Sequence, residues 1–163
     1  MLVAYRCKET NTGRYLRRKM AQEALRALVV DDEPALRALT VQALTQRGIV
    51  CDGARDGDAA LALFDLHSYD LLITDLRMPR KHGHALIIDV LARGEDRPVI
   101  IVLTGVLDCR LAEDLIFRGV DAIEFKPVNF NLLAAKVSAL CERRRRAKLE
   151  LESAAQSSAG LPA

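Results

Sequence analysis

The sequence predicts an α/β fold in which a five-stranded parallel sheet has helices on both faces. Two observations point to this class. Short, continuously apolar runs without strict alternation are typical of strands that are buried on both faces of a parallel sheet. Segments with helical spacing of apolar residues separate these runs, so a strand and a helix alternate five times and right-handed crossovers are expected. A chain of 163 residues suits one domain of this doubly wound kind with modest tails.

The predicted elements follow one another in regular order. Strands are expected at 28–30, 50–54, 71–73, 99–103 and 122–125, the second and fifth on weaker signals. Helices are expected at 34–46, 58–64, 83–91 and 108–118, and the longest runs from 130 to about 150. Pro34 suits a first helical turn, and Gly119 suits a helix end.

Charge divides the chain into three parts. Residues 1–23 carry six basic and two acidic side chains, and residues 142–152 carry five and three, which leaves a net charge of −4 on residues 24–141. We therefore predict a basic N-terminal arm at 1–23, a globular domain at 24–141, and an extension of the last helix with a flexible tail at 142–163. An acidic globule does not attract nucleic acid by charge alone.

The cysteines and the apolar runs indicate where the protein resides. Four widely spaced cysteines form no CxxC pair, so we expect free thiols in a reducing cytoplasm rather than disulfides or a zinc site. No apolar run approaches the ~20 residues that a membrane-spanning helix needs. The N-terminus has its apolar residues before its basic ones, the reverse of a secretion signal. A cytoplasmic protein without membrane contact is expected.

Polar side chains stand where the predicted strands end. Asp31 and Asp32 follow the first strand, Asp75 the third, Thr104 the fourth and Lys126 the fifth. Because the carboxyl ends of parallel strands meet at one edge of the sheet, these five side chains are expected to share a pocket.

Such a pocket suits phosphoryl transfer. Three converging carboxylates repel one another unless positive charge offsets them, and Mg²⁺ and Lys126 are the expected sources. The carboxylate of Asp75 is ionised at neutral pH and needs no general base to attack phosphorus. Thr104 and Lys126 are expected to contact the phosphoryl oxygens. The labile acyl phosphate that results suits a reversible switch.

Four motifs at these strand ends resemble the signatures of response-regulator receiver domains in two-component signalling. They are VVDDE at 29–33, ITDLRMP at 73–79, LTG at 103–105 and FKP at 125–127. The likeness covers about residues 25–141. It implies a flavodoxin-like (βα)5 fold and a phosphoacceptor response regulator. It implies no enzymatic activity beyond self-phosphorylation and self-dephosphorylation.

The resemblance also implies a role for each position. Asp75 would accept phosphate from a histidine kinase or a phosphotransfer protein. Asp32, Asp75 and the main-chain carbonyl of Arg77 would bind Mg²⁺ directly, and Asp31 would act through water. A cis peptide bond before Pro127 is common in this family and is expected here.

One position departs from the family pattern. Ile123 stands three residues before the lysine, where an aromatic residue that turns inward on activation is usual. An aliphatic side chain cannot give that rotamer change, so coupling between phosphorylation and the output surface is expected to be weaker or to take another route.

The resemblance implies that signals leave through the fourth helix, fifth strand and fifth helix, a face that also suits a homodimer. Arg77 and Val106 are expected to hinder water at the phosphoryl group.

Other functions stay open beside the phosphoacceptor switch. A non-switching, receiver-like interaction or dimerisation module is supported by Ile123. A nucleic-acid-binding regulator that uses the basic ends is not favoured. An independent hydrolase is weak, because the sequence has no nucleophile–base pair and no Gly-rich phosphate loop. Only 22 residues follow Cys141, so a stand-alone protein without an output domain at that end is expected.

Overall fold

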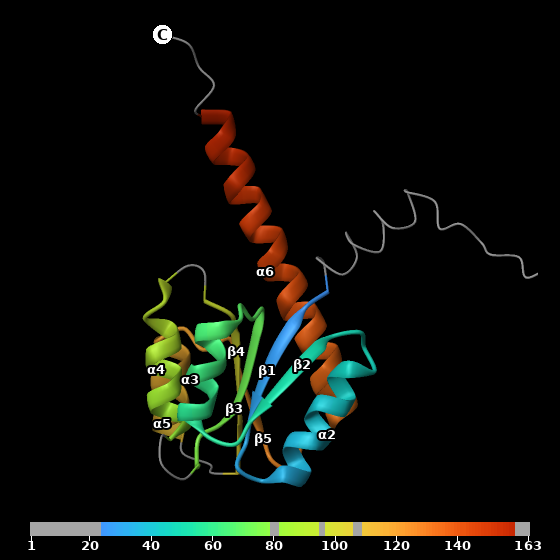
Figure 1. Cartoon of the computed structure of the whole chain (residues 1–163). Coiled ribbons are helices and arrows are strands. Elements are labelled where there is room, and N and C mark those ends of the chain that lie inside the picture. The colour runs from blue at the N-terminus through green and yellow to red at the C-terminus, as the bar shows by residue number, and fades with distance from the viewer. Residues whose placement is uncertain (1–23, 79–81, 95–96, 106–108, 159–163) are drawn as a thin grey trace, which may run out of the picture.

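A computed structural model describes residues 24–78, 82–94, 97–105 and 109–158 (Figure 1). The predicted basic arm at 1–23, Val106 and the last five residues of the predicted tail lie outside the described residues. Within them, no helix is both long and apolar enough to cross a membrane.

Five parallel strands form one sheet in the order β2-β1-β3-β4-β5. The strands are β1 (Arg26–Val30), β2 (Val50–Ala54), β3 (Leu71–Asp75), β4 (Val99–Thr104) and β5 (Ala122–Phe125). Every residue of β3 and β4 is buried, as their continuous apolar sequences predict. The edge strand β2 is largely exposed or half-buried, which agrees with its weaker signal. The predicted five-stranded parallel sheet is confirmed.

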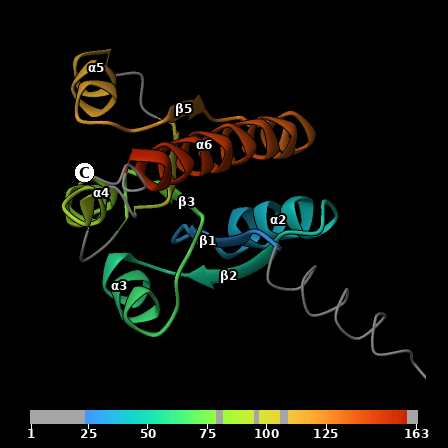
Figure 2. The same cartoon turned by 90° about the horizontal axis from the view of Figure 1, so that it is seen from above.

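Helices cover both faces of this sheet, as predicted (Figure 2). They are α2 (Pro34–Thr45), α3 (Gly57–Leu66), α4 (Gly83–Leu91), α5 (Cys109–Phe117) and α6 (Phe130–Ser158). Helices α3, α4 and α5 pack on one face through residues such as Phe64, Leu86 and Leu115. Helices α2 and α6 pack on the other through Leu44 and Val137. Two apolar clusters, one on each face, thus pack the helices against the sheet.

Helix α6 is longer than expected. The prediction ended it near residue 150 and expected a flexible segment beyond it, whereas the helix continues to Ser158. Residues 130–158 contain neither Gly nor Pro and are rich in Ala, Glu, Leu, Lys and Arg, which have high helix propensity. The second half of α6 therefore projects past the amino edge of the sheet (Figure 1).

The carboxyl edge of the sheet brings together loops that are far apart in sequence. The N–H of Asp31, just after β1, donates to the carbonyl of Ala54 at the end of β2 (3.2 Å). The N–H of Lys126, just after β5, donates to the carbonyl of Thr104 (2.8 Å). The peptide bond between Lys126 and Pro127 is cis, as expected. These contacts fix the main chain on which the candidate site is built.

Candidate functional site

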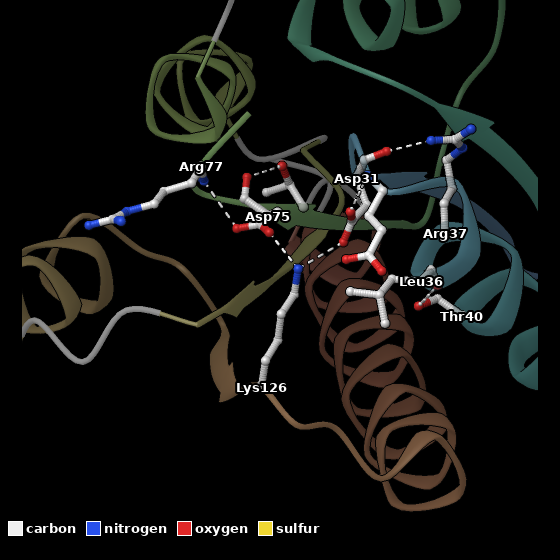
Figure 3. Close-up of polar contacts among 9 residues, drawn as sticks. Asp31, Leu36, Arg37, Thr40, Asp75, Arg77 and Lys126 are labelled. Carbon is white, nitrogen blue, oxygen red and sulfur yellow. Dashed lines mark hydrogen bonds and ion pairs between the residues drawn. The ribbon is translucent and has the colours of Figure 1, made fainter. Parts of the chain in front are cut away.

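Lys126 lies between two of the predicted carboxylates (Figure 3). Its Nζ is 3.0 Å from Oδ2 of Asp31 and 2.5 Å from Oδ2 of Asp75. Asp31 directly follows β1, Asp75 is the last residue of β3, and Lys126 directly follows β5. In sequence, 95 positions separate Asp31 from Lys126. The parallel sheet therefore assembles, from distant segments, a carboxylate pair with an ammonium group between its members.

Main-chain donors hold the remaining oxygen of each carboxylate. The N–H of Glu33 donates to Oδ1 of Asp31 (2.9 Å), and the N–H of Arg77 donates to Oδ1 of Asp75 (3.0 Å). Each donor lies two residues after its acceptor, so a tight turn at the strand end fixes the side chain. Both carboxylates are thus held from two sides and are preorganised for charge-dependent chemistry.

The ammonium group of Lys126 is stabilised in its charged form. Partial burial lowers the pKa of this side chain, but hydrogen bonds to Asp75 and Asp31, with the negative charge of both, raise it further than burial lowers it. The pKa of Lys126 is therefore raised above its usual value of 10.5. Lys126 therefore carries its full charge at neutral pH, as an offset for the two carboxylates.

Three carboxylates form a cluster with the geometry of a small cation site. Asp31, Asp32 and Asp75 each offer one oxygen, and these oxygens lie within 4.8 Å of one another. Asp31 and Asp75 are buried, whereas Asp32 is exposed to solvent. Mg²⁺ takes oxygen ligands at about 2.1 Å, so two ligands on opposite sides are about 4.2 Å apart, and it keeps several waters. The donor type, the spacing and the solvent access of Asp32 all fit Mg²⁺.

Thr104 and Ile123 occupy different surroundings. Thr104 is buried at the end of β4, and its strand partner is Phe125, which directly precedes Lys126. Ile123 is half-buried and packs against the apolar cluster under α3, α4 and α5, paired in register with Val102. Thr104 thus lies at the edge that carries the carboxylates, whereas Ile123 belongs to the core.

Arg37 is a site neighbour that the sequence analysis missed. Its Nη1 donates to the main-chain carbonyl of Asp31 at 2.6 Å (Figure 3). Its side chain lies beside Gly53 of β2, where an added Cβ would be 3.3 Å from Cδ of Arg37. No motif marks a residue six positions after Asp31, because the contact depends on how α2 packs over β2. Arg37 places a second cation near the acidic cluster.

An apolar cavity of about 140 Å³ adjoins the site. Leu36 and Thr40 of α2 form one wall, and Pro127 and Phe130 form another, with Asp31 and Lys126 at one end. The hydroxyl of Thr40 donates to the carbonyl of Leu36 (2.9 Å), which leaves the methyl group of Thr40 to line the cavity. The polar site thus opens beside an apolar recess between α2 and the start of α6.

Comparison with known proteins agrees with this geometry. A family profile described as "Response regulator receiver domain" matches residues 27–138. The probable transcriptional regulator ycf27 of Cyanidium caldarium is 33% identical over 76% of this chain and 49% of its own length. The sensor histidine kinase RcsC of Salmonella typhimurium is 32% identical over 74% of this chain and 13% of its own length. The chain thus spans half or less of these curated relatives.

A solved structure shows the same likeness over a whole chain. The response regulator receiver protein from Pseudomonas putida superposes with a TM-score of 0.67 at 32% identity. The match covers 71% of this chain and 97% of that chain. The family profile ends within α6, so the part that these proteins share is the sheet, helices α2 to α5 and the start of α6.

Proposed function

Because this chain belongs to the response regulator receiver domain family, we propose that it is a phosphoacceptor of a two-component pathway and is phosphorylated on Asp75. The observation that carries the proposal is the contact of Lys126 Nζ with both Asp75 (2.5 Å) and Asp31 (3.0 Å). An ammonium group in that position contacts the carboxylate of Asp75 before modification, and it can contact a phosphoryl oxygen once Asp75 is phosphorylated. Phosphoryl transfer depends mainly on such positioning and charge neutralisation.

The covalent step needs no proton transfer to activate the nucleophile. An oxygen of the Asp75 carboxylate forms a bond to phosphorus, and the bond between phosphorus and the donor's imidazole nitrogen or acyl oxygen breaks. The electron pair leaves with the donor, and Asp75 becomes a mixed anhydride. Hydrolysis later returns the carboxylate and releases phosphate.

The acidic cluster would hold Mg²⁺ through Asp32, Asp75 and the main-chain carbonyl of Arg77, with Asp31 acting through water. The bound cation would supply charge neutralisation for the phosphoryl oxygens. This chain's own residues do the remaining work: Lys126 contacts one phosphoryl oxygen, and the Thr104 hydroxyl contacts another.

We propose a histidine-containing phosphodonor as the partner. RcsC, which matches this chain over a small part of its length, is named a sensor histidine kinase. Transfer from a phosphohistidine breaks a high-energy P–N bond, so the phosphoryl group can pass to a carboxylate without a nucleotide.

The proposed response to phosphorylation starts at Thr104. Thr104 pairs in register with Phe125, and the half-buried Ile123 lies two residues earlier on the same strand, so β5 offers a route through which a shift can spread. Ile123 is the proposed switch position. Its aliphatic side chain packs against the core cluster, so we expect a packing adjustment rather than a ring rotation.

Intact-mass analysis after incubation with acetyl phosphate and Mg²⁺ tests the proposal. The expected result is a gain of one phosphoryl group, lost in Asp75→Asn and lost when Mg²⁺ is chelated. Asp58→Asn is the matched control, because Asp58 is exposed in the first turn of α3, outside the acidic cluster. No gain with acetyl phosphate or with any phosphohistidine donor would leave a non-switching interaction module as the better description.

A further inference from the structure

Arg37 of α2 holds the turn that carries Asp32 from both ends. Its main-chain N–H donates to the carbonyl of Glu33 (3.0 Å), and its Nη1 donates to the carbonyl of Asp31 (2.6 Å; Figure 3). These two carbonyls belong to the residues directly after and directly before Asp32. One residue of α2 therefore fixes the main chain on either side of the exposed carboxylate of the acidic cluster.

The side-chain contact of Arg37 acts on the peptide bond that joins Asp31 to Asp32. The carbonyl of Asp31 and the N–H of Asp32 share one plane, so a donor on that carbonyl fixes the direction in which the chain enters Asp32. Other contacts hold the peptide groups on either side: the N–H of Asp31 donates to the carbonyl of Ala54 (3.2 Å), and the N–H of Glu33 donates to Oδ1 of Asp31 (2.9 Å). Arg37 thus supplies the middle one of three consecutive restraints.

Gly53 of β2 gives the Arg37 side chain its path to this carbonyl. A Cβ atom added to Gly53 would be 3.3 Å from Cδ, 3.6 Å from Cγ and 3.7 Å from Nε of Arg37. The stem of Arg37 therefore lies along the bare main chain of an edge strand. Gly53 is exposed and pairs in register with Val29, so a larger residue at this position presses on Arg37 rather than on the core.

We propose that Arg37 is a positioning residue for the Mg²⁺ site and acts by presenting the carboxylate of Asp32. This role rests on the proposed function, in which the acidic cluster binds Mg²⁺. Asp31 and Asp75 are buried, and each accepts from Lys126. Asp32 is exposed to solvent, so its position depends on its main chain. Restraint of that main chain before the cation arrives lowers the ordering cost of binding.

The charge of Arg37 alone would have the opposite effect on binding. A cation beside an acidic cluster repels a dication, so its removal, taken as electrostatics only, strengthens Mg²⁺ binding. Loss of the restraint on the peptide between Asp31 and Asp32 weakens Mg²⁺ binding instead. The direction of the change in affinity therefore separates a positioning role from an electrostatic one. A merely structural role changes the stability of the fold and leaves the affinity as it was.

Calorimetric titration of the full chain with Mg²⁺ tests the proposal. Arg37→Ala is expected to weaken binding about tenfold or more, the usual effect of losing a residue that orients a metal ligand. Arg47→Ala is the matched control, because Arg47 is an exposed residue just after the same helix, and its removal takes away the same charge far from the contact with Asp31. This control should bind Mg²⁺ like the wild type.

A second variant displaces the Arg37 side chain without removing its charge. Gly53→Val should also weaken Mg²⁺ binding. Gly53→Ala should do so less, because a single methyl group requires the flexible stem of Arg37 to move by only a few tenths of an ångström. In the Arg37→Ala background, Gly53→Val should have no further effect on affinity, because the side chain that it displaces is gone.

Tighter or unchanged Mg²⁺ binding by Arg37→Ala would overturn the proposal. So would an effect of Gly53→Val that persists in full in the Arg37→Ala background. Either result leaves the proposed function intact, because the wild type still binds Mg²⁺ and accepts phosphate on Asp75. Absence of Mg²⁺ binding by the wild type removes the proposed function, and the role of Arg37 with it. If Arg37→Ala does not fold, the affinity of Gly53→Val decides, and an unchanged value overturns the proposal.

Discussion

Gly83, the first residue of α4, packs directly against the main chain of Asp75. A Cβ atom added to Gly83 would lie 1.8 Å from the carbonyl oxygen of Asp75 and 2.8 Å from its carbonyl carbon. The N–H of Gly83 also donates to the carbonyl of Leu76 (3.2 Å). The chain that leaves β3 therefore returns against the strand end so closely that only glycine fits, and the position of Asp75 depends on that fit.

Replacing this glycine should damage both the fold and the site. Gly83→Ala is expected to lower the free energy of unfolding by about 3 kcal/mol, the upper part of the usual range for overpacking, and to slow the reaction of Asp75 with acetyl phosphate. Chemical denaturation and intact-mass kinetics measure the two effects. Gly105→Ala is the control, because a Cβ there meets nothing within 4 Å. Equal destabilisation by both substitutions would contradict the packing argument.

Removing the ammonium group of Lys126 should change metal binding and phosphorylation in opposite directions. Lys126→Met takes away a positive charge that lies against Asp31 and Asp75, so Mg²⁺ affinity is expected to rise by roughly tenfold as repulsion of the dication is lost. The rate of phosphorylation should fall, because the phosphoryl oxygens lose their cation. Calorimetry with Mg²⁺ and intact-mass kinetics report the two quantities.

The control for that experiment is Lys136→Met. Lys136 is an exposed lysine of α6 that pairs with Glu124, so its removal changes net charge by the same amount away from the carboxylates. It should leave Mg²⁺ affinity and phosphorylation unchanged. An effect of similar size in both variants would mean that net charge, and not the position of Lys126, governs the site.

Asp31 and Asp32 should respond differently to neutralisation. Asp32 is exposed, so Asp32→Asn should weaken Mg²⁺ binding at least about tenfold with little change in stability. Asp31 is 3% exposed and accepts from Glu33 and Lys126. Asp31→Asn should therefore also lower the free energy of unfolding in Mg²⁺-free buffer, by about 1–3 kcal/mol. Denaturation with and without Mg²⁺ distinguishes the two, and equal stability loss would refute the assignment.

The sheet could be predicted because its signal is local. Continuous apolar runs such as 71–73 and 99–103 identify buried strands, and once the strands are parallel their carboxyl ends must share an edge. That edge is enough to bring Asp75 and Lys126 together. The starts of helices were predicted less accurately. Helix α3 begins at Gly57 rather than at 58, because the Asp56 side chain accepts from the N–H of Ala59 and caps the helix one residue earlier.

The contacts that depend on packing could not be predicted from one sequence. Arg37 reaches the carbonyl of Asp31 only because α2 lies over Gly53. Gly83 touches Asp75 only because α4 begins against the end of β3. The basic run 143–146 was predicted only as part of an extension of the last helix, and nothing in the sequence indicated that Arg144 contacts Asp121 at the opposite edge of the sheet. In each instance the partner is set by the relative placement of elements, which hydrophobic spacing does not encode.

A buried tyrosine should make stability depend on alkaline pH. Tyr69 is 6% exposed, packs edge-on against Phe64, and donates to Oδ2 of Asp52 at 2.8 Å. Burial, then the hydrogen bond to Asp52 and its negative charge, raise the pKa of Tyr69 to about 12, although the nearby Arg26 acts in the opposite direction. In the unfolded chain the pKa of tyrosine is about 10.

The sign of the effect follows from proton binding. Between pH 10 and about 12 the folded state keeps the phenolic proton that the unfolded state loses, so stability falls as pH rises through this window. Below it, the contribution of Tyr69 is fully present. Tyr69→Phe lacks the titrating group, so the stability advantage of the wild type over this variant should be constant from neutral pH to about pH 10 and should shrink above it. Chemical denaturation of both proteins across this range measures the difference. Asp52→Asn in both backgrounds completes a double-mutant cycle. If the stability advantage of the wild type over Tyr69→Phe stays constant through about pH 12, the hydrogen bond between Tyr69 and Asp52 does not control the titration of Tyr69.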